Sequence, residues 1–243
     1  MQTWYITDPG CVRPQNQDAC LVEQLDENCT LCVVCDGMGG AKSGNVASHL
    51  ACEVFTEEIL RSYKKDMTTS EAERVLRSAA NLANVSVYEH SMLSEEFRGM
   101  GTTLVAVLLR GQEALVINIG DSRAYYVDPD GIRCVTTDHS VVQYMVSRGE
   151  LTPEQAKNHP NKNLITRAIG PADRVMADVF TISVSKGDFF LLCSDGLSNQ
   201  MADQEILFEV AHGVRQDDCC QRLLEIAKER GAPDNVTCVL VEV

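Results

Sequence analysis

The sequence predicts an α+β protein in which packed antiparallel sheets are covered by helices. Apolar strand-like runs are numerous, and several are joined by short turns containing glycine or proline, as in "LLRGQEAL" and "VDPDGIR". Such short links are typical of hairpins, whose strands run antiparallel. The long helical patterns separate groups of strands instead of following every strand, which argues against a doubly wound parallel sheet.

The expected strands are spread along the whole chain. Each is a run of aliphatic, β-branched or aromatic residues bounded by turn-forming residues. They cover residues 19–24, 30–35, 102–109, 114–119, 123–127, 132–136, 178–184, 189–193 and 236–243.

Helical periodicity predicts long helices over about 44–63 and 70–93, and a third over 217–230. The segment 138–170 differs, because it combines short helical pieces ("SVVQYMVSRG", "TPEQAKN") with the polar stretch "HPNKN". We expect this segment to leave the sheets and form a flap over a site. Since no linker or internal repeat interrupts the chain, we expect residues 1–243 to form a single domain.

Composition limits the classes of partner. The chain has 243 residues, of which 44% are hydrophobic and 23% charged, and its net charge is −14. Such a charge repels nucleic acid and anionic lipid, so neither nucleic acid nor a membrane is an expected partner. The N-terminal residues lack a basic region followed by an apolar core, and no apolar run approaches the roughly 18 residues of a membrane span. We therefore expect a cytoplasmic protein.

The chain contains 11 cysteines, and Cys29, Cys32 and Cys35 repeat at a spacing known from iron–sulfur and zinc proteins. Their segment, "TLCVVC", reads as a strand, on which side chains three residues apart point to opposite faces. We therefore expect small buried hydrophobic residues here and no cysteine-ligated metal.

Four aspartates lie where expected strands begin or end. Asp36 and Gly37 follow the apolar run of "LCVVCDGMGG", Asp121 follows "VINIG", Asp195 follows "FFLLCS", and Asp234 precedes the last strand. One such residue is explained by a tight turn with a capping carboxylate. Four of them indicate a cluster. Mg²⁺ and Mn²⁺ prefer a few carboxylates together with backbone carbonyls and water, and a glycine lets its carbonyl approach an ion closely.

Eight segments occur in an order that resembles the bacterial branch of the metal-dependent type-2C protein serine/threonine phosphatases. They are "VRPQNQDA", "CDGMGGAKSG", "GMGTTL", "INIGDSRAY", "TTDHS", "LITRAIG", "LLCSDGL" and "DNVT". The resemblance runs from Asp8 to nearly the last residue. It implies a four-layer α-β-β-α sandwich, with two antiparallel sheets between helix pairs and a two-metal site in a cleft at one end.

The resemblance also implies roles for individual residues. Asp36 would bridge two Mn²⁺ or Mg²⁺ ions and Gly37 would contribute its carbonyl, while Asp195 and Asp234 would complete the metal shell with water. The remaining implied roles are a weaker third metal position at Asp121 with Asp195, orientation of a water by Asp18, and binding of the substrate phosphate by Arg13. From its context alone, beside Pro14, Arg13 also fits a plain surface arginine.

The implied activity is hydrolysis of phosphoserine and phosphothreonine in proteins by water activated at a binuclear metal centre. The resemblance further suggests a cognate serine/threonine kinase as a partner, with the kinase itself and its targets as the expected substrates. Two positions depart from the family pattern. Gln17 stands where glutamate is common, and Met38 stands where many eukaryotic relatives have a histidine that donates a proton, so the general acid is unassigned.

Two other functions stay open at the level of sequence. One is a regulatory module that binds phosphoproteins without turnover, which Gln17 favours slightly and the intact aspartates disfavour. The other is a structural Ca²⁺ site, against which stand the lack of EF-hand spacing and the wide separation of the aspartates. His139 and His159 lie in the expected flap, where they either approach substrate or are simply solvated or packed.

Overall fold

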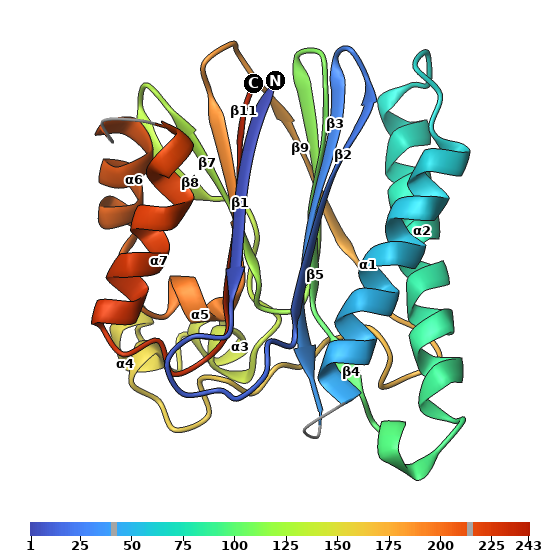
Figure 1. Ribbon diagram of the computed structural model, residues 1–243, viewed down its shortest axis with the longest axis vertical. Helices are drawn as coiled ribbons and strands as arrows, with labels where there is room; N and C mark the ends of the chain where they lie inside the picture. The colour runs from blue at the N-terminus through green and yellow to red at the C-terminus, as the bar shows by residue number, and fades with distance from the viewer. Residues whose placement is uncertain (40–42, 213–215) are drawn as a thin grey trace.

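The computed structural model describes residues 1–39, 43–212 and 216–243, and its two antiparallel sheets pack face to face between helices (Figure 1). The predicted fold class is thereby confirmed. Gly40, part of the glycine-rich turn expected after Asp36, lies outside the described residues. The first sheet contains β2 (Asp18–Asp26), β3 (Cys29–Met38), β5 (Leu104–Arg110), β6 (Glu113–Ile119) and β9 (Asp178–Ser183) in this order, and the short β4 (Gly101–Thr102) pairs with the end of β3.

The second sheet joins both ends of the chain. Its strands are β1 (Gln2–Asp8), β11 (Val236–Glu242), β10 (Phe189–Cys193), β7 (Arg123–Asp128) and β8 (Gly131–Cys134), in this order. The long central strands β10 and β11 are almost entirely buried because a sheet covers one face and helices cover the other.

A pair of helices covers the outer face of each sheet (Figure 1). The first sheet is covered by α1 (Ser43–Ser62) and α2 (Thr69–Ser91), and the second by α6 (Asp203–His212) and α7 (Cys219–Glu229). Helix α2 begins at a capping box, in which the side chain of Thr68 and that of Glu71 each bond the other residue's backbone N–H. Two 3₁₀ turns, Glu95–Phe97 and Gln216–Asp218, accompany the helices.

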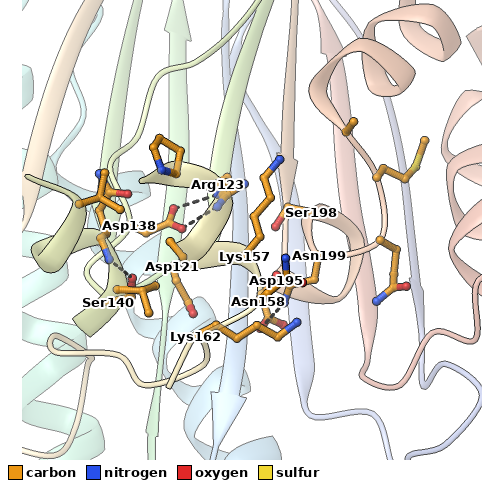
Figure 2. Close-up of a pocket in the computed structure, with 18 residues that line it drawn as sticks. Asp121, Arg123, Asp138, Ser140, Lys157, Asn158, Lys162, Asp195, Ser198 and Asn199 are labelled. Atoms are coloured by element: carbon orange, nitrogen blue, oxygen red, sulfur yellow. Dashed lines mark hydrogen bonds and ion pairs between the residues drawn. The ribbon is translucent and has the colours of Figure 1, made fainter. Parts of the chain in front are cut away.

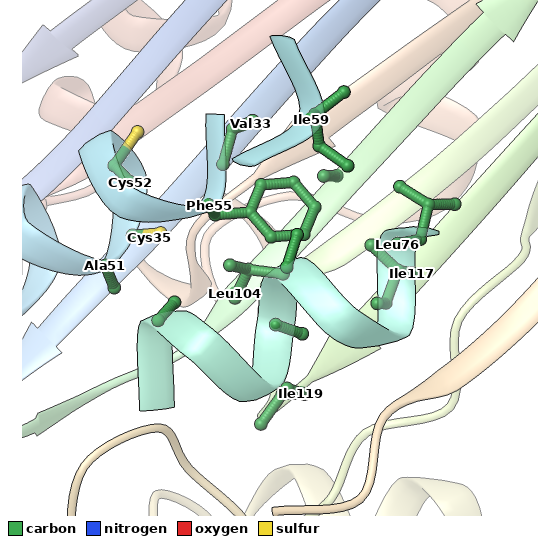
Figure 3. Close-up of a cluster of buried hydrophobic side chains, with 14 of the residues drawn as sticks. Val33, Cys35, Ala51, Cys52, Phe55, Ile59, Leu76, Leu104, Ile117 and Ile119 are labelled. Carbon is green, nitrogen blue, oxygen red and sulfur yellow. The ribbon is translucent and has the colours of Figure 1, made fainter. Parts of the chain in front are cut away.

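Alternation along β3 divides the core into layers. Leu31, Val33 and Cys35 face α1 and α2, where Phe55 of α1 is central (Figure 3). Cys32 and Val34 face the opposite side and pack between the two sheets. The cysteines of this strand thus lie on both faces, as expected, and all of the protein's cysteines are free thiols. Packing on both faces holds β3 rigidly, and β3 carries Asp36.

Several elements were not expected from the sequence. Strand β1 (QTWYITD) is an edge strand whose residues are only partly buried, so its pattern is weak, yet it pairs with β11 over its full length. Helix α6 and the one-turn helix α5 (Asp195–Ser198) were also missed. The expected strand at 102–109 is divided into β4 and β5, with Thr103 between them.

The segment 138–170, called the flap below, leaves the second sheet after β8 and returns to the first sheet before β9, as expected. It contains α3 (Val141–Ser147) and α4 (Pro153–Lys157). Its base is tied down by the backbone bridge between Thr102 and Ile169 and by that between Ser140 and Ile165. Among the described helices, none is long and apolar enough to cross a membrane. The cytoplasmic location stays a prediction.

Candidate active site

The four aspartates singled out in the sequence meet at one end of the two sheets. Asp36 is near the end of β3, Asp121 follows β6, Asp195 opens α5 directly after β10, and Asp234 precedes β11. All four line one cleft of 230 Å³, together with Arg13, Gln17, Gly37, Met38, Gly39, Thr103, Asn163 and Ile165. We call this the carboxylate cleft. Both sheets contribute to it, so it forms only when they pack together.

Close backbone contacts at two glycines bring the aspartates together. A Cβ at Gly37 would collide with the carbonyl oxygens of Gln17 and Gly44, and the Gly37 N–H donates to the Gln17 oxygen at 3.0 Å. A Cβ at Gly196 would collide with the carbonyl oxygen of Asn235. Since Gly37 follows Asp36 and Gly196 follows Asp195, these contacts set how closely the carboxylate-bearing segments approach.

Two threonines and a serine fix the backbone at Asp36. The Asp36 N–H donates to Thr103 Oγ1 at 2.9 Å, and its carbonyl accepts from the Thr103 N–H and from Thr102 Oγ1, each at 2.9 Å. Thr103 Oγ1 also shares a hydrogen bond of 2.7 Å with Ser122 Oγ, next to Asp121. No role was expected for these residues from the sequence, although they lie in the segments "GMGTTL" and "INIGDSRAY".

Crowding of carboxylates raises their pKa values. Burial raises the pKa of Asp36 well above its usual range, and the nearby charges of Asp18, Asp195 and Asp121 raise it further. Burial and a neighbouring aspartate (Asp195 for Asp121, Asp234 for Asp195) raise the pKa of Asp121 to about 7 and that of Asp195 to about 6. A cation in the cleft would relieve this repulsion and favour the ionised carboxylates.

Asp18 is buried and only partly satisfied. Its Oδ2 accepts a hydrogen bond of 2.8 Å from Ser194 Oγ, whereas its Oδ1 has no hydrogen-bond partner among the described residues. Burial raises the pKa of Asp18 to about 7, although the hydrogen bonds from Thr237 and Ser194 oppose that rise. A buried carboxylate oxygen without a donor fits a place where water or a cation completes the site.

Arg13 lies at the rim of the cleft, with 54% of its side chain exposed. Its guanidinium pairs with Asp234 Oδ2 at 2.8 Å, and this hydrogen bond raises the pKa of Arg13. The structure therefore brings Arg13 into the cleft, whereas its sequence context alone, beside Pro14, favoured a plain surface arginine. Gln17 also lines the cleft, with its amide packed against Gly44.

The donor set fits hard divalent cations. It consists of carboxylates and the Gly37 carbonyl, with no thiol or imidazole among the lining residues. Asp18, whose Oδ1 is unpartnered among the described residues, is not one of the lining residues. Within the described chain, no three acidic, histidine or cysteine side chains converge tightly enough to hold an ion unaided. Any ion here would therefore take part of its shell from carbonyl oxygens and water.

The two flap histidines have different positions. His139 is buried, its Nδ1 accepts a hydrogen bond from the Gly120 N–H at 3.0 Å, and its Nε2 lies 3.0 Å from Asp178 Oδ2. It anchors the base of the flap to the turn before Asp121, so it does not face the cleft. His159 Nδ1 accepts from the Asn161 N–H at 3.1 Å, within the flap itself. Neither histidine lines the carboxylate cleft.

The family model of Protein phosphatase 2C matches residues 14–240. The chain is 33% identical to the "Serine/threonine phosphatase stp" of Listeria monocytogenes over 246 residues, which covers 100% of this chain and 96% of that protein. This chain therefore belongs to the protein phosphatase 2C family. The sequence-based prediction of the family and of its enzyme class, a protein serine/threonine phosphatase, is confirmed.

Solved structures agree with this assignment. The crystal structure of serine/threonine phosphatase Stp1 from Staphylococcus aureus matches with a TM-score of 0.93 and 34% identity, over 100% of this chain and 94% of that one. The catalytic domain of the serine/threonine protein phosphatase PstP, solved in complex with two manganese ions, matches with a TM-score of 0.85 and 31% identity. That match covers 99% of this chain and 97% of the other.

Proposed function

We propose that this protein is a metal-dependent phosphatase that releases phosphate from phosphoserine and phosphothreonine in proteins. The observation that carries the proposal is the meeting of Asp36, Asp121, Asp195 and Asp234 in one cleft, from segments far apart in the chain. Because Asp36 comes from one sheet and Asp195 follows a strand of the other, we also propose that residues 1–243 act as a single catalytic domain.

We assign the tightly held pair of Mn²⁺ or Mg²⁺ ions to Asp36, the Gly37 carbonyl, Asp195 and Asp234, and a weaker third ion to Asp121 with Asp195. When bound, such ions lower the pKa of water and stabilise charge on the attacking and leaving oxygens of an in-line displacement. The chain's own contribution is to hold the carboxylates in fixed positions through the contacts at Gly37, Gly196 and Thr103.

Arg13 and Asp18 take the remaining roles. A guanidinium carries five N–H groups, so Arg13 can contact Asp234 with one nitrogen and present others to a substrate phosphate. Asp18, held by Ser194, has an oxygen without a hydrogen-bond partner among the described residues, with which it would orient the attacking water. With water as the nucleophile, no covalent phosphoenzyme forms. Met38 lines the cleft but its thioether has no proton to give the leaving oxygen, so proton donation falls to another group.

The proposed partners are phosphoproteins, among them a cognate serine/threonine kinase and the proteins that it phosphorylates. This part of the proposal rests on membership of the family and on the names of the relatives. A cytoplasmic setting, predicted from the sequence, agrees with such partners.

The test is hydrolysis of a phosphothreonine peptide with Mn²⁺, Mg²⁺, Ca²⁺ or EDTA, by the wild type, Asp195→Asn and Asp130→Asn. Asp195→Asn keeps the shape of a proposed ligand but removes its charge, whereas Asp130 is exposed in the β7–β8 turn and serves as the matched control. We expect turnover with Mn²⁺ or Mg²⁺ that EDTA abolishes, that Asp195→Asn loses and that Asp130→Asn retains.

Two outcomes would contradict the proposal. Turnover that survives EDTA would remove the cations from the reaction. Tight binding of the phosphopeptide without turnover in any metal would favour the phosphoprotein-binding module instead.

A further inference from the structure

A second hollow adjoins the carboxylate cleft on the side of the flap. It has a volume of 460 Å³ and shares Asp121 and Asp195 with the cleft, so the two are continuous. Its walls are flap residues on one side and the segment from α5 to α6 on the other (Figure 2). We call it the flap groove and define it by Arg123, Asp138, Lys157, Lys162 and Asn199.

The charged side chains of the flap groove fall into three groups. Asp121 and Asp195 belong to the proposed metal site. Arg123 and Asp138 neutralise each other through two hydrogen bonds, of 2.9 Å from Nε and 2.7 Å from the terminal nitrogen. Lys157 and Lys162 remain, and neither has a carboxylate partner in the part of the chain that the structure describes.

These two lysines are unusual for their setting. The protein carries a net charge of −14, so most of its surface repels an acidic ligand. In Figure 2 the Lys157 side chain passes between Asp121 and Ser198 with its ammonium pointing away from Asp121 and Asp195, and the Lys162 side chain extends below Asp121 toward the side of Asp195. Once cations offset the aspartates, the groove offers two positive charges beside the amide of Asn158, while the amide of Asn199 donates to Asp195 Oδ2 at 3.1 Å.

We propose that the flap groove binds acidic side chains of the substrate protein, aspartate or glutamate, that flank the phosphorylated residue. This inference rests on the proposed function, because it concerns the segment that continues from the phosphoresidue out of the carboxylate cleft. Charge complementarity carries it: among the described residues Lys157 and Lys162 are the groove's cations without a carboxylate partner, and a phosphoresidue in the cleft would place its neighbours alongside them.

The test compares phosphothreonine peptides with glutamates before the phosphoresidue, glutamates after it, or glutamines in all those places. Enzymes are the wild type, the double variant Lys157→Gln/Lys162→Gln, and Lys186→Gln. Lys186 is an exposed lysine in the turn between β9 and β10, at the end of the sheets away from the flap (Figure 1). The measurements are kcat/KM with Mn²⁺ and fluorescence anisotropy of labelled peptides.

We expect the wild type to prefer one of the glutamate peptides by about three- to tenfold in kcat/KM, the range of two exposed ion pairs. The preference should shrink as salt rises from about 50 to 300 mM, because exposed charges are screened. It should fall to near unity in the double variant and persist in Lys186→Gln.

Equal kcat/KM for all peptides, or a preference that the double variant keeps, would overturn the inference while leaving the proposed function intact. If no peptide is hydrolysed, the proposed function is wrong. The anisotropy measurements then test on their own whether the flap groove binds acidic side chains. Tighter binding of a glutamate peptide that depends on Lys157 and Lys162 would then support it, and equal binding would refute it.

Discussion

The carboxylate cleft is built from the ends of buried strands, whereas the flap beside it is built from short helices and exposed turns. Asp36 is fixed by three backbone hydrogen bonds and by β3, which is packed on both faces. The flap helices α3 and α4 bury a single residue, Val142, between them. Under the proposed function this difference is a division of labour: the reacting groups would sit on rigid elements, and the groups that meet the variable part of a substrate would sit on a segment with little core.

The largest effect on activity is expected from a substitution in the carboxylate cleft. Asp36→Ala should lower kcat/KM for a phosphopeptide on the order of a thousandfold or more, because it removes the carboxylate that would bridge the cations. The thermal midpoint without metal should not fall, since the change also relieves the repulsion between this half-buried carboxyl group and the neighbouring carboxylates. Activity within tenfold of the wild type would show that Asp36 is no ligand.

Gly196→Ala tests whether packing of the two aspartate-bearing segments matters. The new Cβ would press on the Asn235 carbonyl, so we expect a loss of about 1–3 kcal/mol in unfolding free energy. Displacement of Asp195 and Asp234 should also lower kcat on the order of a hundredfold. Gly111→Asn is the control, because Gly111 has open space around it and asparagine tolerates its positive φ. Urea unfolding and peptide kinetics measure both.

Arg13 lies at the exposed rim of the cleft. Arg13→Ala should raise KM for a phosphopeptide on the order of tenfold, with a smaller effect on kcat, because a charge-assisted bidentate contact is lost. Arg13→Lys should recover only part of this, since an ammonium lacks the planar fork. Unchanged kinetics in Arg13→Ala would leave Arg13 with the salt bridge to Asp234 as its only role.

Replacing each of the two flap histidines tests whether His139 stabilises the protein by anchoring the flap, because His159 lies in the flap without such an anchoring contact among the described residues. His139→Ala leaves the buried Gly120 N–H without its acceptor, so it should cost about 1–3 kcal/mol of unfolding free energy. His159→Ala should stay within about 0.5 kcal/mol, as for an ordinary surface change. Equal losses in urea unfolding of the two variants would remove His139 as the anchor of the flap.

The smallest effect concerns pH in the absence of metal. The folded pKa values of Asp18, Asp121 and Asp195 (about 7, 7 and 6) exceed that of a free aspartate near 4, so the folded state binds more protons than the unfolded state between these values. Stability should therefore fall as pH rises from about 4 to 7. In EDTA we expect the thermal midpoint to drop by a few degrees between pH 5 and 8.

Addition of Mn²⁺ should restore the midpoint at pH 8 much more than at pH 5, because only ionised carboxylates bind the ion. A midpoint in EDTA that rises over the same pH interval would contradict the assigned repulsion. The same titration with Asp195→Asn should show a shallower fall.

The sequence by itself determined the fold class, most strands, the long helices α1, α2 and α7, and the flap. Apolar runs of strand length and helical periodicity are local signals, readable without knowledge of partners. The motifs also identified Asp36, Asp121, Asp195 and Asp234 before any contact was known. Strand β1 and helix α6 carried weaker local patterns, and they are stabilised by pairing with β11 and by packing on the second sheet.

Only the tertiary structure decided how these residues meet. The supports of Asp36 at Thr102 and Thr103 lie 66 and 67 residues away along the chain, and the contact of Gly196 with Asn235 joins the start of α5 to the strand that follows Asp234. Packing likewise decides the place of His139 behind the site, the pairing of Arg13 with Asp234, and the position in the flap groove of Lys157 and Lys162, which have no carboxylate partner among the described residues. Distances and burial between distant segments have no local signature, so the pattern of residues alone could not supply them.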